Sequence, residues 1–418
     1  MYNDYLSQRD TYKLLEEISN REYDDDISFL HTLINDIVSH SDFEINSGRV
    51  WVLNTEDESY ELNYQFGDGA DLPADYSLPI SDYPFLSELN LKRTILKYET
   101  NTFLKEKGIE LYSVTGVGDL EELPNGEYFK YLIGFNAPEM LPLFYETLNI
   151  ISGVATVTIR SITNNSRQQE IQKDFNKAAE IQKNLLPDNA YKFHDYSVYG
   201  ICIPSSFVGG DYFDYILNTD EQEETLAVLI SDAASSGLPA AIQALFVSGA
   251  IRMGMNFSPK ISQFISKLNS LIFDRFPYER FVTLFYCELS MSSNRLVLYA
   301  NAGHCPSLHY RPTTGNFKML EPTGGLLGLM KQQTFGVENF RMHQGDILVL
   351  YTDGITESRN KKAEFYGEER IKKVILEMHD KSAEEISKGI IEDVNKFTGK
   401  IDRSDDKTVV VVKRDYSE

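Results

Sequence analysis

The amino-acid sequence predicts an α+β protein in which two globular domains are joined by a long helix. Mixed helix and strand patterns occupy about residues 1–150 and again residues 188–418, whereas residues 151–187 between them show a helical pattern without strand signals. With 418 residues, the chain is long enough for two or three domains of about 100–200 residues each.

The N-terminal section begins with helical periodicity, in which apolar residues recur at Ile27, Leu30, Ile34, Ile37 and Val38. Residues 48–67 then alternate between apolar and polar on both sides of a polar tip at residues 54–57, which predicts a β-hairpin. We expect further strands at Glu110–Val114 and Tyr128–Phe135, and helical segments around Leu86–Leu96. Together these elements predict an α+β domain of the size of a sensor domain.

The connecting helix runs from about Leu141 to Leu186, and Pro187 ends it. Its later part carries a short heptad pattern, with Gln182 at one of the positions and apolar residues at Ile171, Phe175, Ala178 and Leu185. We interpret this helix as a parallel coiled-coil connector of a dimer. An amphipathic helix that packs on one of the domains is the alternative.

The C-terminal section alternates strands and helices. Strands are predicted at Tyr196–Ile203, Thr225–Ser231, Phe281–Leu289, Arg295–Asn301, Asp346–Thr352 and Thr408–Lys413. Helices are predicted at Leu238–Met255, Pro259–Phe273, Gly367–His379 and Ser382–Phe397. The strands between residues 281 and 301 form an antiparallel pair with a turn at residues 292–294, so we expect mostly antiparallel sheets covered by helices.

Acidic residues lie at the ends of four of these apolar segments. They are Asp211 and Asp214 after a pair of glycines, Asp232 at the end of one strand, Asp353 at the end of another, and Asp405 and Asp406 before the last. Carboxylates that converge in one site raise each other's pKa, and the first three motifs contain no Lys or Arg to offset the charge. Hard divalent cations are the natural compensation, whereas four unrelated turns are the alternative.

Composition narrows the possible partners and the compartment. The formal net charge of −23, from 63 acidic and 40 basic residues, argues against nucleic acid or an anionic membrane as a partner. The three cysteines have no paired or metal-ligand spacing, and the N-terminus lacks the pattern of a signal peptide. We expect no apolar run that approaches the ~20 residues of a membrane span, and we therefore expect a cytoplasmic protein.

Six motifs of the C-terminal section occur in an order that resembles the metal-dependent Ser/Thr protein phosphatases of the PPM family, in particular the bacterial SpoIIE type. They are FVGGDYFDY, ISDAASSGLPAA, NAGHCPSLHY, GGLLGL, LVLYTDGITE and DDKTVVVV. The resemblance covers about residues 190–415, and the preceding AEIQKNLLP looks like the helix that introduces this domain in that branch.

The resemblance implies an α/β/β/α sandwich with two Mn²⁺ or Mg²⁺ ions between its sheets. It implies that Asp232 bridges both ions and that Ala233 offers its backbone carbonyl to one of them. Asp353 and Asp406 are implied to hold the other ion, and Asp211 to bind a metal directly or through water. These four aspartates are the implied catalytic residues, which activate a water that attacks phosphoserine or phosphothreonine in line.

The second motif departs from the family pattern Asp-x-x-Gly-(His/Lys)-Gly. Ser235 replaces the first glycine and Ser236 the basic residue, so the loop after Asp232 is expected to be stiffer or differently placed. Because all four aspartates are present, we expect an active enzyme, with reduced or tightly regulated activity as the alternative. Residues 200–214 contain no arginine to clamp the phosphate, which leaves that task to the metals.

Two other features of this section have simpler interpretations. We interpret His304, in a turn between strands, as structural rather than as a general acid. Gly324, Gly325 and Gly328 are expected to shape a loop over the site, because the lysine and spacing of a nucleotide-binding P-loop are absent.

Residues 20–160 resemble a GAF sensor domain in their size, in the hairpin and in the long helix that leaves the domain. The signature of cyclic-nucleotide-binding GAF domains is absent, so we assign no such ligand. Five aromatic residues either line a small-molecule pocket or, as we favour for most of them, belong to the core or an interface: Trp51, Tyr60, Tyr64, Phe66 and Phe85.

The resemblances predict a phosphatase that acts on a small anti-sigma-factor antagonist in bacterial partner-switching signalling. We expect a homodimer that responds to an unknown small-molecule or protein signal at the N-terminal domain, through movement of the helices that follow Asp232. A weakly active or inactive phosphatase-fold regulator, acting as a protein-interaction module, is the alternative. A nucleotide phosphodiesterase is disfavoured by the negative charge and by the lack of a phosphate-cradling motif.

Overall fold

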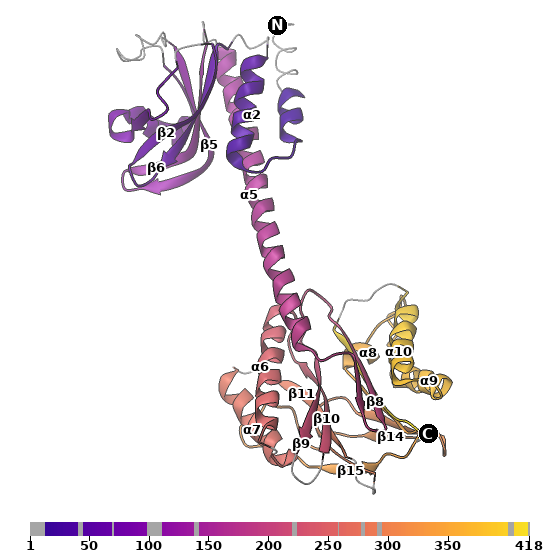
Figure 1. Cartoon of the computed structure of the whole chain (residues 1–418). Helices are drawn as coiled ribbons and strands as arrows, with labels where there is room; N and C mark the ends of the chain where they lie inside the picture. The colour runs from indigo at the N-terminus through magenta and orange to yellow at the C-terminus, as the bar shows by residue number, and fades with distance from the viewer. Residues whose placement is uncertain are drawn as a thin grey trace. The chain divides into compact units, whose positions relative to one another are not determined.

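The computed structural model describes residues 13–40, 45–68, 71–97, 111–137, 142–219, 224–257, 259–276, 281–290, 295–399 and 405–416. The chain divides into two compact units, Met1–Gln172 and Lys173–Glu418, and the boundary falls inside one long helix. Each unit has its own sheets and its own hydrophobic core (Figure 1).

The N-terminal unit is built on one six-stranded sheet in the order β3-β2-β1-β6-β5-β4. Its strands are β1 (Ser47–Asn54), β2 (Ser59–Gly67), β3 (Ser77–Pro79), β4 (Thr94–Lys97), β5 (Tyr112–Leu123) and β6 (Gly126–Asn136). Its helices are α2 (Asp26–Ser39), α3 (Leu89–Lys92), the 3-10 helices η2 (Ile80–Asp82) and η3 (Pro84–Glu88), and the first part of α5 (Pro142–Leu185).

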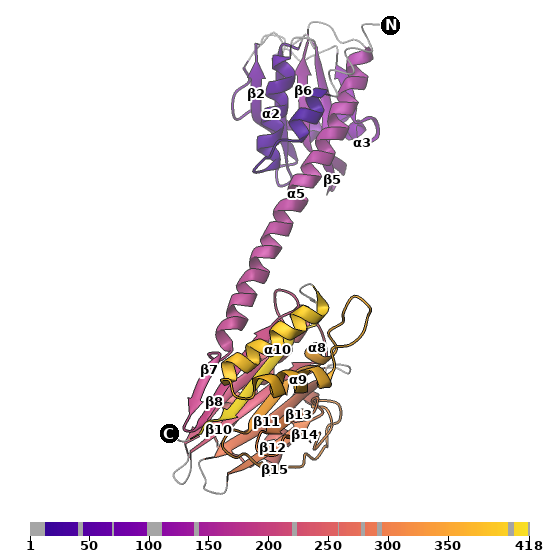
Figure 2. The ribbon, with the colours of Figure 1, turned by 90° about the vertical axis from the view of Figure 1, so that its right-hand side faces the viewer.

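The two faces of this sheet bury different sets of side chains. On one face, α2 and α5 pack through Leu30, Ile34 and Ile151 against sheet residues such as Val50 (Figure 2). On the other face, Trp51 packs against the segment from β3 to α3. Successive strand residues point to opposite faces, so the alternating pattern of β1 supplies both cores.

The structure confirms the predicted helix at Ile27–Val38 as α2, the hairpin as β1 and β2, and the strand at Tyr128–Phe135 as part of β6. The strand expected from Glu110 is β5, although residue 110 itself lies outside the described residues. The expected helix around Leu86–Leu96 is only partly correct, because the chain leaves the helical state after Lys92 and Thr94–Lys97 pairs with β5. This pairing supplies hydrogen bonds that a short isolated helix lacks.

Helix α5 is 44 residues long and confirms the predicted helix from about Leu141 to Leu186. Its N-terminal part is buried against the sheet of the first unit through Leu148, Ile151 and Ala155. Further along, Ile171 and Ile181 are exposed, by 50% and 58%. The coiled-coil pairing of this part stays a prediction.

The C-terminal unit contains two antiparallel sheets, one of five strands in the order β15-β12-β11-β10-β9 and one of six in the order β14-β13-β16-β17-β8-β7. The strands are β7 (Ala190–Phe193), β8 (Tyr196–Ile203), β9 (Tyr212–Thr219), β10 (Glu224–Ala233), β11 (Val282–Ser290), β12 (Leu296–Ala302), β13 (Ser307–Arg311), β14 (Asn316–Leu320), β15 (Glu338–Arg341), β16 (Ile347–Tyr351) and β17 (Lys407–Arg414). The helices are α6 (Gly237–Met255), α7 (Ile261–Arg275), α8 (Asp353–Thr356), α9 (Glu368–Met378) and α10 (Ala383–Thr398).

The sheets pack face to face and helices cover both outer faces, with α6 and α7 on the five-stranded sheet and α9 and α10 on the other (Figure 1). In β17, Val410 and Val412 point into the core between the sheets, while Val409 and Val411 point toward the helices. Burial on both faces explains why this strand reads as a continuous valine run rather than an alternating one. The predicted α/β/β/α sandwich is therefore confirmed.

All six strands and four helices that were predicted in this section are present, and β11 and β12 form the predicted antiparallel pair. Their turn at residues 292–294 lies outside the described residues. The prediction did not include β7, β9, β13, β14 and β15.

Helix α6 is apolar enough to resemble a membrane span, since residues 238–255 have a mean hydropathy of 1.3 over 18 residues. The prediction that no apolar run approaches the length of a span overlooked this stretch. Its side chains Ala244, Val247 and Ile251 are buried in the layer between α6, α7 and the sheet. We therefore interpret it as a core helix.

Candidate active site

Two of the predicted acids are brought together by the register of the five-stranded sheet. Ser231 of β10 pairs with Tyr212 of β9 in antiparallel register. Asp232 and Asp211, the next residues outward on the two strands, therefore lie side by side at one end of this sheet.

The six-stranded sheet brings the other two acids together in the same way. Tyr351 at the end of β16 pairs with Val409 of β17. Asp353 lies two residues after the end of β16 and Asp406 directly precedes β17, so both carboxylates belong to one end of this sheet.

Hydrogen bonds join these two ends across the sandwich. Asp211 Oδ2 accepts bonds from Thr352 Oγ1 at 2.8 Å and from Thr408 Oγ1 at 2.6 Å. Both threonines lie at the end of the opposite sheet, Thr352 directly before Asp353 and Thr408 two residues after Asp406. The four predicted aspartates are thus collected at one end of the sandwich.

The loop before β9 wraps around the carboxylate of Asp406. Asp406 Oδ1 accepts from the backbone N–H of Ser205 at 2.6 Å, and Oδ2 accepts from that of Gly210 at 2.6 Å. A Cβ atom on Gly209 would lie 2.5 Å from Asp406 Oδ2. The paired glycines are therefore needed because the backbone passes directly over this carboxylate.

The last turns of α5 hold the same loop. The side chain of Gln182 donates from Nε2 to the carbonyl oxygen of Gly209 at 2.6 Å, and its Oε1 accepts from the N–H of Gly209 at 3.1 Å. Phe175, two turns earlier, contacts the ring of Phe207 with a centroid distance of 6.0 Å. The two bonds to the backbone of Gly209 thus join the connecting helix to the loop that binds Asp406.

The electrostatics of the site reflect this crowding. Burial raises the pKa of Asp211 well above its usual value, and the charge of Asp232 adds to the effect. Burial also raises the pKa of Asp232 to about 8, with further contributions from Asp353, Asp405 and Asp406. Burial also raises the pKa of Asp353, although part of this residue is exposed to solvent, and the negative charge of Glu357 adds to the effect. No basic side chain is among the main influences on Asp211 and Asp232, so their charges call for a cation.

The donor set fits hard divalent cations in its chemistry, because it consists of oxygen atoms and carries excess negative charge. Within the residues that the structure describes, however, no three Asp, Glu, His or Cys side chains are already grouped as a metal site. The reason is visible at Asp211 and Asp406, whose oxygen atoms face threonine hydroxyls and backbone N–H groups. Metal binding would require some of these carboxylates to turn.

The segment after Asp232 shows how the chain accommodates its unusual second motif. The Ala233 carbonyl, predicted as a metal ligand, accepts a bond from the N–H of Ser235 at 2.7 Å. Ser236 has an extended backbone with φ of −118°, whereas Gly237 keeps the left-handed φ of +68° that favours glycine. Serine at position 236 is therefore compatible with this loop without backbone strain.

Asp214, which belongs to the first acidic motif, does not join the other acids. It is fully buried and pairs with Arg252 of α6, with distances of 2.7 Å from Nε and 2.8 Å from Nη2. It also accepts a hydrogen bond from the hydroxyl of Tyr212. This ion pair attaches α6 to β9.

The structure supports the structural interpretation of His304. Its Nε2–H donates to the carbonyl oxygen of Tyr351 at 3.0 Å, and Nδ1 accepts from Thr283 Oγ1 at 2.8 Å. Burial lowers the pKa of the imidazole to about 4, so the ring stays neutral at pH 7. Gly324 and Leu327 form bridges to Ala302 and Val282, so the predicted glycine loop lies against β12 and β11.

Three residues of this region were not singled out from the sequence as parts of the site. They are Thr352, Thr408 and Gln182, which hydrogen-bond to it. Thr352 directly precedes Asp353 and Thr408 lies two residues after Asp406, but their bonds to Asp211 join distant parts of the chain and have no local signal. Gln182 has no local signal either, because its partner Gly209 lies 27 residues away.

The sequence of the C-terminal unit is similar to those of known proteins. Residues 222–415 match the family model of stage II sporulation protein E (SpoIIE). Phosphoserine phosphatase RsbU of Bacillus subtilis (strain 168) is 28% identical over 251 residues, which cover 59% of this chain and 72% of RsbU. Protein IcfG of Synechocystis sp. is 27% identical over 226 residues, which cover 47% of this chain but only 35% of IcfG.

Solved structures agree on the fold. The SiaA-PP2C domain of Pseudomonas aeruginosa superimposes with a TM-score of 0.51 at 16% identity, and the match covers 60% of this chain and 98% of that domain. The SpoIIE match includes Asp232, Asp353 and Asp406 and leaves the N-terminal unit outside. The C-terminal unit of this chain is therefore a phosphatase domain of the SpoIIE family, of the PPM type.

Proposed function

We propose that this chain is a divalent-metal-dependent protein phosphatase that hydrolyses phosphoserine or phosphothreonine on a small anti-sigma-factor antagonist in partner-switching signalling. The observation that carries this proposal is the convergence of four aspartates from two sheets within a SpoIIE-family domain. The likeness to the phosphoserine phosphatase RsbU supports the choice of substrate class.

The chain's own residues have distinct tasks in this proposal. Asp211, Asp232, Asp353 and Asp406 would hold two Mn²⁺ or Mg²⁺ ions, together with the carbonyl of Ala233. When bound, such ions activate water and neutralise the charge of the phosphoryl group. Thr352 and Thr408 fix the position of Asp211, and the backbone of the loop at residues 205–210 fixes that of Asp406.

The test is a rate measurement on the full-length protein with p-nitrophenyl phosphate, and then with candidate phosphoproteins, in Mn²⁺, in Mg²⁺ and in EDTA. Asp232→Ala and Asp353→Asn should each lower the rate by at least about 100-fold, since even the partners of metal ligands cost about 10–100-fold. Asp380→Asn is the matched control, because Asp380 is exposed and forms a surface ion pair with its chain neighbour Lys381. Full activity of Asp232→Ala, or in EDTA, would contradict the proposal.

A regulator of phosphatase fold with little activity is the second candidate. Ser235 and Ser236 in the second motif favour it, as does the hydrogen bonding of Asp211 and Asp406 to protein donors. Such a regulator would bind the phosphorylated partner without releasing phosphate under any of the metal conditions. Turnover by the wild-type protein that Asp353→Asn removes would exclude it.

We further propose that the protein works as a cytoplasmic homodimer whose N-terminal unit is a GAF-like regulatory domain. Ile171 and Leu185, two of the predicted heptad positions of α5, are exposed and support a coiled-coil contact between two copies. The bonds from Gln182 to Gly209 supply a route from α5 to the acidic site, beside the predicted movement of α6 and α7. Deletion of residues 1–165 should change both the phosphatase rate and the oligomeric state, and an unchanged pair of values would refute this part.

A further inference from the structure

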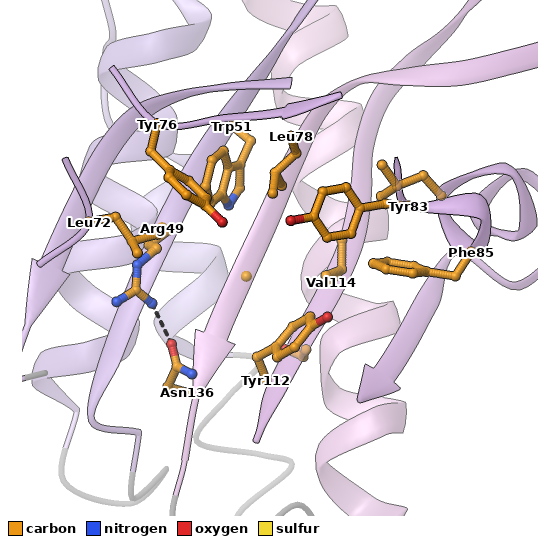
Figure 3. Close-up of a pocket in the computed structure, with 13 residues that line it drawn as sticks. Arg49, Trp51, Leu72, Tyr76, Leu78, Tyr83, Phe85, Tyr112, Val114 and Asn136 are labelled. Carbon is orange, nitrogen blue, oxygen red and sulfur yellow. Dashed lines mark hydrogen bonds between the residues drawn. The ribbon is translucent and has the colours of Figure 1, made fainter. Parts of the chain in front are cut away.

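The N-terminal unit contains a pocket on the face of its sheet that is turned away from α2 and α5. Strands β1, β5 and β6 form its floor, and the segment from residue 72 to η3 forms its wall (Figure 3). The empty space within it, including the part open to solvent, is about 550 Å³. The pocket belongs to the N-terminal unit alone and lies outside the SpoIIE-family match.

The pocket has aromatic walls. Its aromatic lining residues are Trp51, Tyr76, Tyr83, Phe85 and Tyr112 (Figure 3). They meet in edge contacts, with ring centroids 6.0 Å apart for Trp51 and Tyr76 and 6.0 Å apart for Tyr83 and Phe85. Such walls favour a ligand with a flat apolar or aromatic body. This finding also divides the five aromatics considered from the sequence, because only Trp51 and Phe85 line the pocket.

The other three aromatic residues, Tyr60, Tyr64 and Phe66, lie outside the pocket lining. Tyr60 is fully buried and donates a hydrogen bond to the carbonyl oxygen of Phe129 at 2.6 Å. Tyr64 faces α2, where its hydroxyl donates to Asn35 Oδ1 at 2.7 Å. Phe66 is 40% exposed near the end of β2. The preference for a core role therefore holds for Tyr60 and Tyr64, and an interface role of Phe66 stays a prediction.

A buried positive charge lies at one end of the pocket. Arg49 is only 6% exposed, and its Nη1 donates to the amide oxygen of Asn136 (Figure 3). Burial lowers the pKa of Arg49, and the exposed Asp71 offsets part of this effect. An arginine remains protonated in such surroundings because its guanidinium is far too basic to lose its proton near neutral pH.

This charge decides between two classes of ligand. Aromatic walls alone also suit quaternary ammonium ions, which bind to ring faces. A cation would be repelled by the guanidinium of Arg49, and also by Lys97, whose Nζ lies 4.5 Å from the centroid of Phe85. An anionic group is attracted by both, so the charge of the pocket favours an anion.

The hydroxyl groups of Tyr76, Tyr83 and Tyr112 add polar groups to the lining of the pocket (Figure 3). The tyrosine hydroxyls are close enough to influence one another, since Tyr76 raises the pKa of Tyr83 and of Tyr112 after the larger effect of burial. A guanidinium and several hydroxyl groups form a suitable set of donors for a carboxylate, which accepts up to about four hydrogen bonds.

We propose that this pocket binds a small aromatic carboxylate, with the ring between the aromatic walls and the carboxylate directed to Arg49. The proposal goes beyond the phosphatase function and does not depend on it. Its test therefore uses binding alone, in the full-length protein.

Trp51 provides the measurement, because it is the only tryptophan of the chain and it lines the pocket. Its fluorescence, excited at a wavelength that the probes do not absorb, is titrated with phenylacetate, with neutral phenylacetamide and with cationic phenethylamine. The three probes share a benzene ring and differ in charge. We expect saturable binding in the order phenylacetate, phenylacetamide, phenethylamine, with about a tenfold difference or more between the first two, as for a hydrogen bond to a charged group.

Two variants locate the site. Arg49→Met should weaken phenylacetate by about tenfold or more and leave phenylacetamide unchanged, whereas Arg160→Gln, which removes an exposed charge paired with Asp119, should change neither. Leu78→Phe places a larger side chain on half-exposed β3 at the wall of the pocket and should weaken all three probes. If circular dichroism shows that Arg49→Met does not fold, the comparison of the three probes on the wild-type protein still tests the preference for a carboxylate. Leu78→Phe then still tests whether the ligand binds in this pocket.

Three outcomes would overturn the proposal. Equal affinity for phenylacetate and phenylacetamide in the wild-type protein would remove the carboxylate from the assignment. Unchanged binding by Leu78→Phe would place the ligand elsewhere. The absence of any saturable change in Trp51 fluorescence with all three probes would show that the pocket does not bind this class.

Discussion

Replacement of Arg252 by methionine tests how the ion pair between α6 and β9 stabilises the C-terminal unit. Asp214 is fully buried and Arg252 is 51% exposed, with contacts of 2.7 and 2.8 Å between them. The Arg252→Met variant keeps most of the apolar stem of the side chain and removes the guanidinium. It leaves the hydroxyl of Tyr212 as a neutral hydrogen-bond donor to the buried carboxylate.

The expected cost lies between two limits. Removing one partner of a fully buried ion pair costs about 3–5 kcal/mol, whereas an exposed pair contributes about 0–1 kcal/mol. Because Arg252 is half exposed and Asp214 is not, we expect a loss of about 2–3 kcal/mol in the free energy of unfolding at pH 7. Burial already raises the pKa of Asp214 in the presence of Arg252, and the variant should raise it further.

This shift gives the loss a pH dependence with a defined sign. A carboxyl group whose pKa is raised in the folded state is protonated without penalty at low pH and destabilises the fold as the pH rises. The loss caused by Arg252→Met should therefore be largest near neutral pH and smaller toward pH 4, the usual range of an aspartate.

The assay is calorimetric unfolding of the full-length protein at several pH values, in which Trp51 fluorescence identifies the transition of the N-terminal unit. Arg275→Met is the control, since Arg275 is exposed and also lies in the last turn of its helix. In the double variant with Asp214→Asn, part of the loss should be recovered. A loss below about 0.5 kcal/mol, or one equal at pH 7 and pH 4, would refute this reasoning.

Three further predictions concern other parts of the chain. The pKa of His304 is lowered from 6.5 to about 4, so the unfolded chain binds a proton that the folded chain excludes. Stability should fall as the pH decreases from about 6.5 to 4, by up to about 1.4 kcal/mol per pH unit, and calorimetry of His304→Gln should show a smaller fall. Gly354→Ala should lower phosphatase activity by about tenfold or more, because its Cβ would lie 1.9 Å from the carbonyl oxygen of Asp406. The double variant Ile171→Lys and Leu185→Lys should shift the mass measured by light scattering from dimer to monomer, because it charges the proposed coiled-coil contact.

Each of these has its own control. Gly249→Ala, in α6, places a Cβ where no atom lies within 4 Å, so it should leave activity unchanged. Lys177→Ala changes an exposed position of α5 and should leave the dimer intact. A pH dependence that is the same in His304→Gln and the wild type, full activity of Gly354→Ala, or a dimeric double variant would count against the respective prediction.

The strands that were predicted correctly are those whose burial is a local property of the chain. Tyr196–Ile203 has the same bounds as β8, and the valine run of β17 was recognised because both of its faces are buried. Strand β13 was missed because it carries His309 and Arg311, which are polar. Both bind the buried carboxylate of Asp346, 35 or more residues away, and a local pattern contains no sign of that partner.

In the candidate site, too, the residues that were predicted are those with a local signal in the sequence. Asp232, Asp353 and Asp406 were predicted because each lies at one end of a predicted apolar strand. Asp211 was predicted because it follows a pair of glycines. The hydroxyls of Thr352 and Thr408 could not be assigned, because their bonds to Asp211 depend on how two different sheets are placed against each other. Gln182 was read as a heptad position, whereas its amide binds Gly209 in the structure.

The pair of bonds between Gln182 and Gly209 limits how α5 can turn about its own axis. Neighbouring residues of an α-helix are separated by about 100° around that axis. A turn of one residue would carry the amide away from Gly209 and bring Ile181 or Lys183 to its place, and neither side chain can both donate and accept. Rotation of α5 would therefore break both bonds to Gly209 together. The loop at residues 205–210 would then have two states, one bound to Gln182 and one free of it.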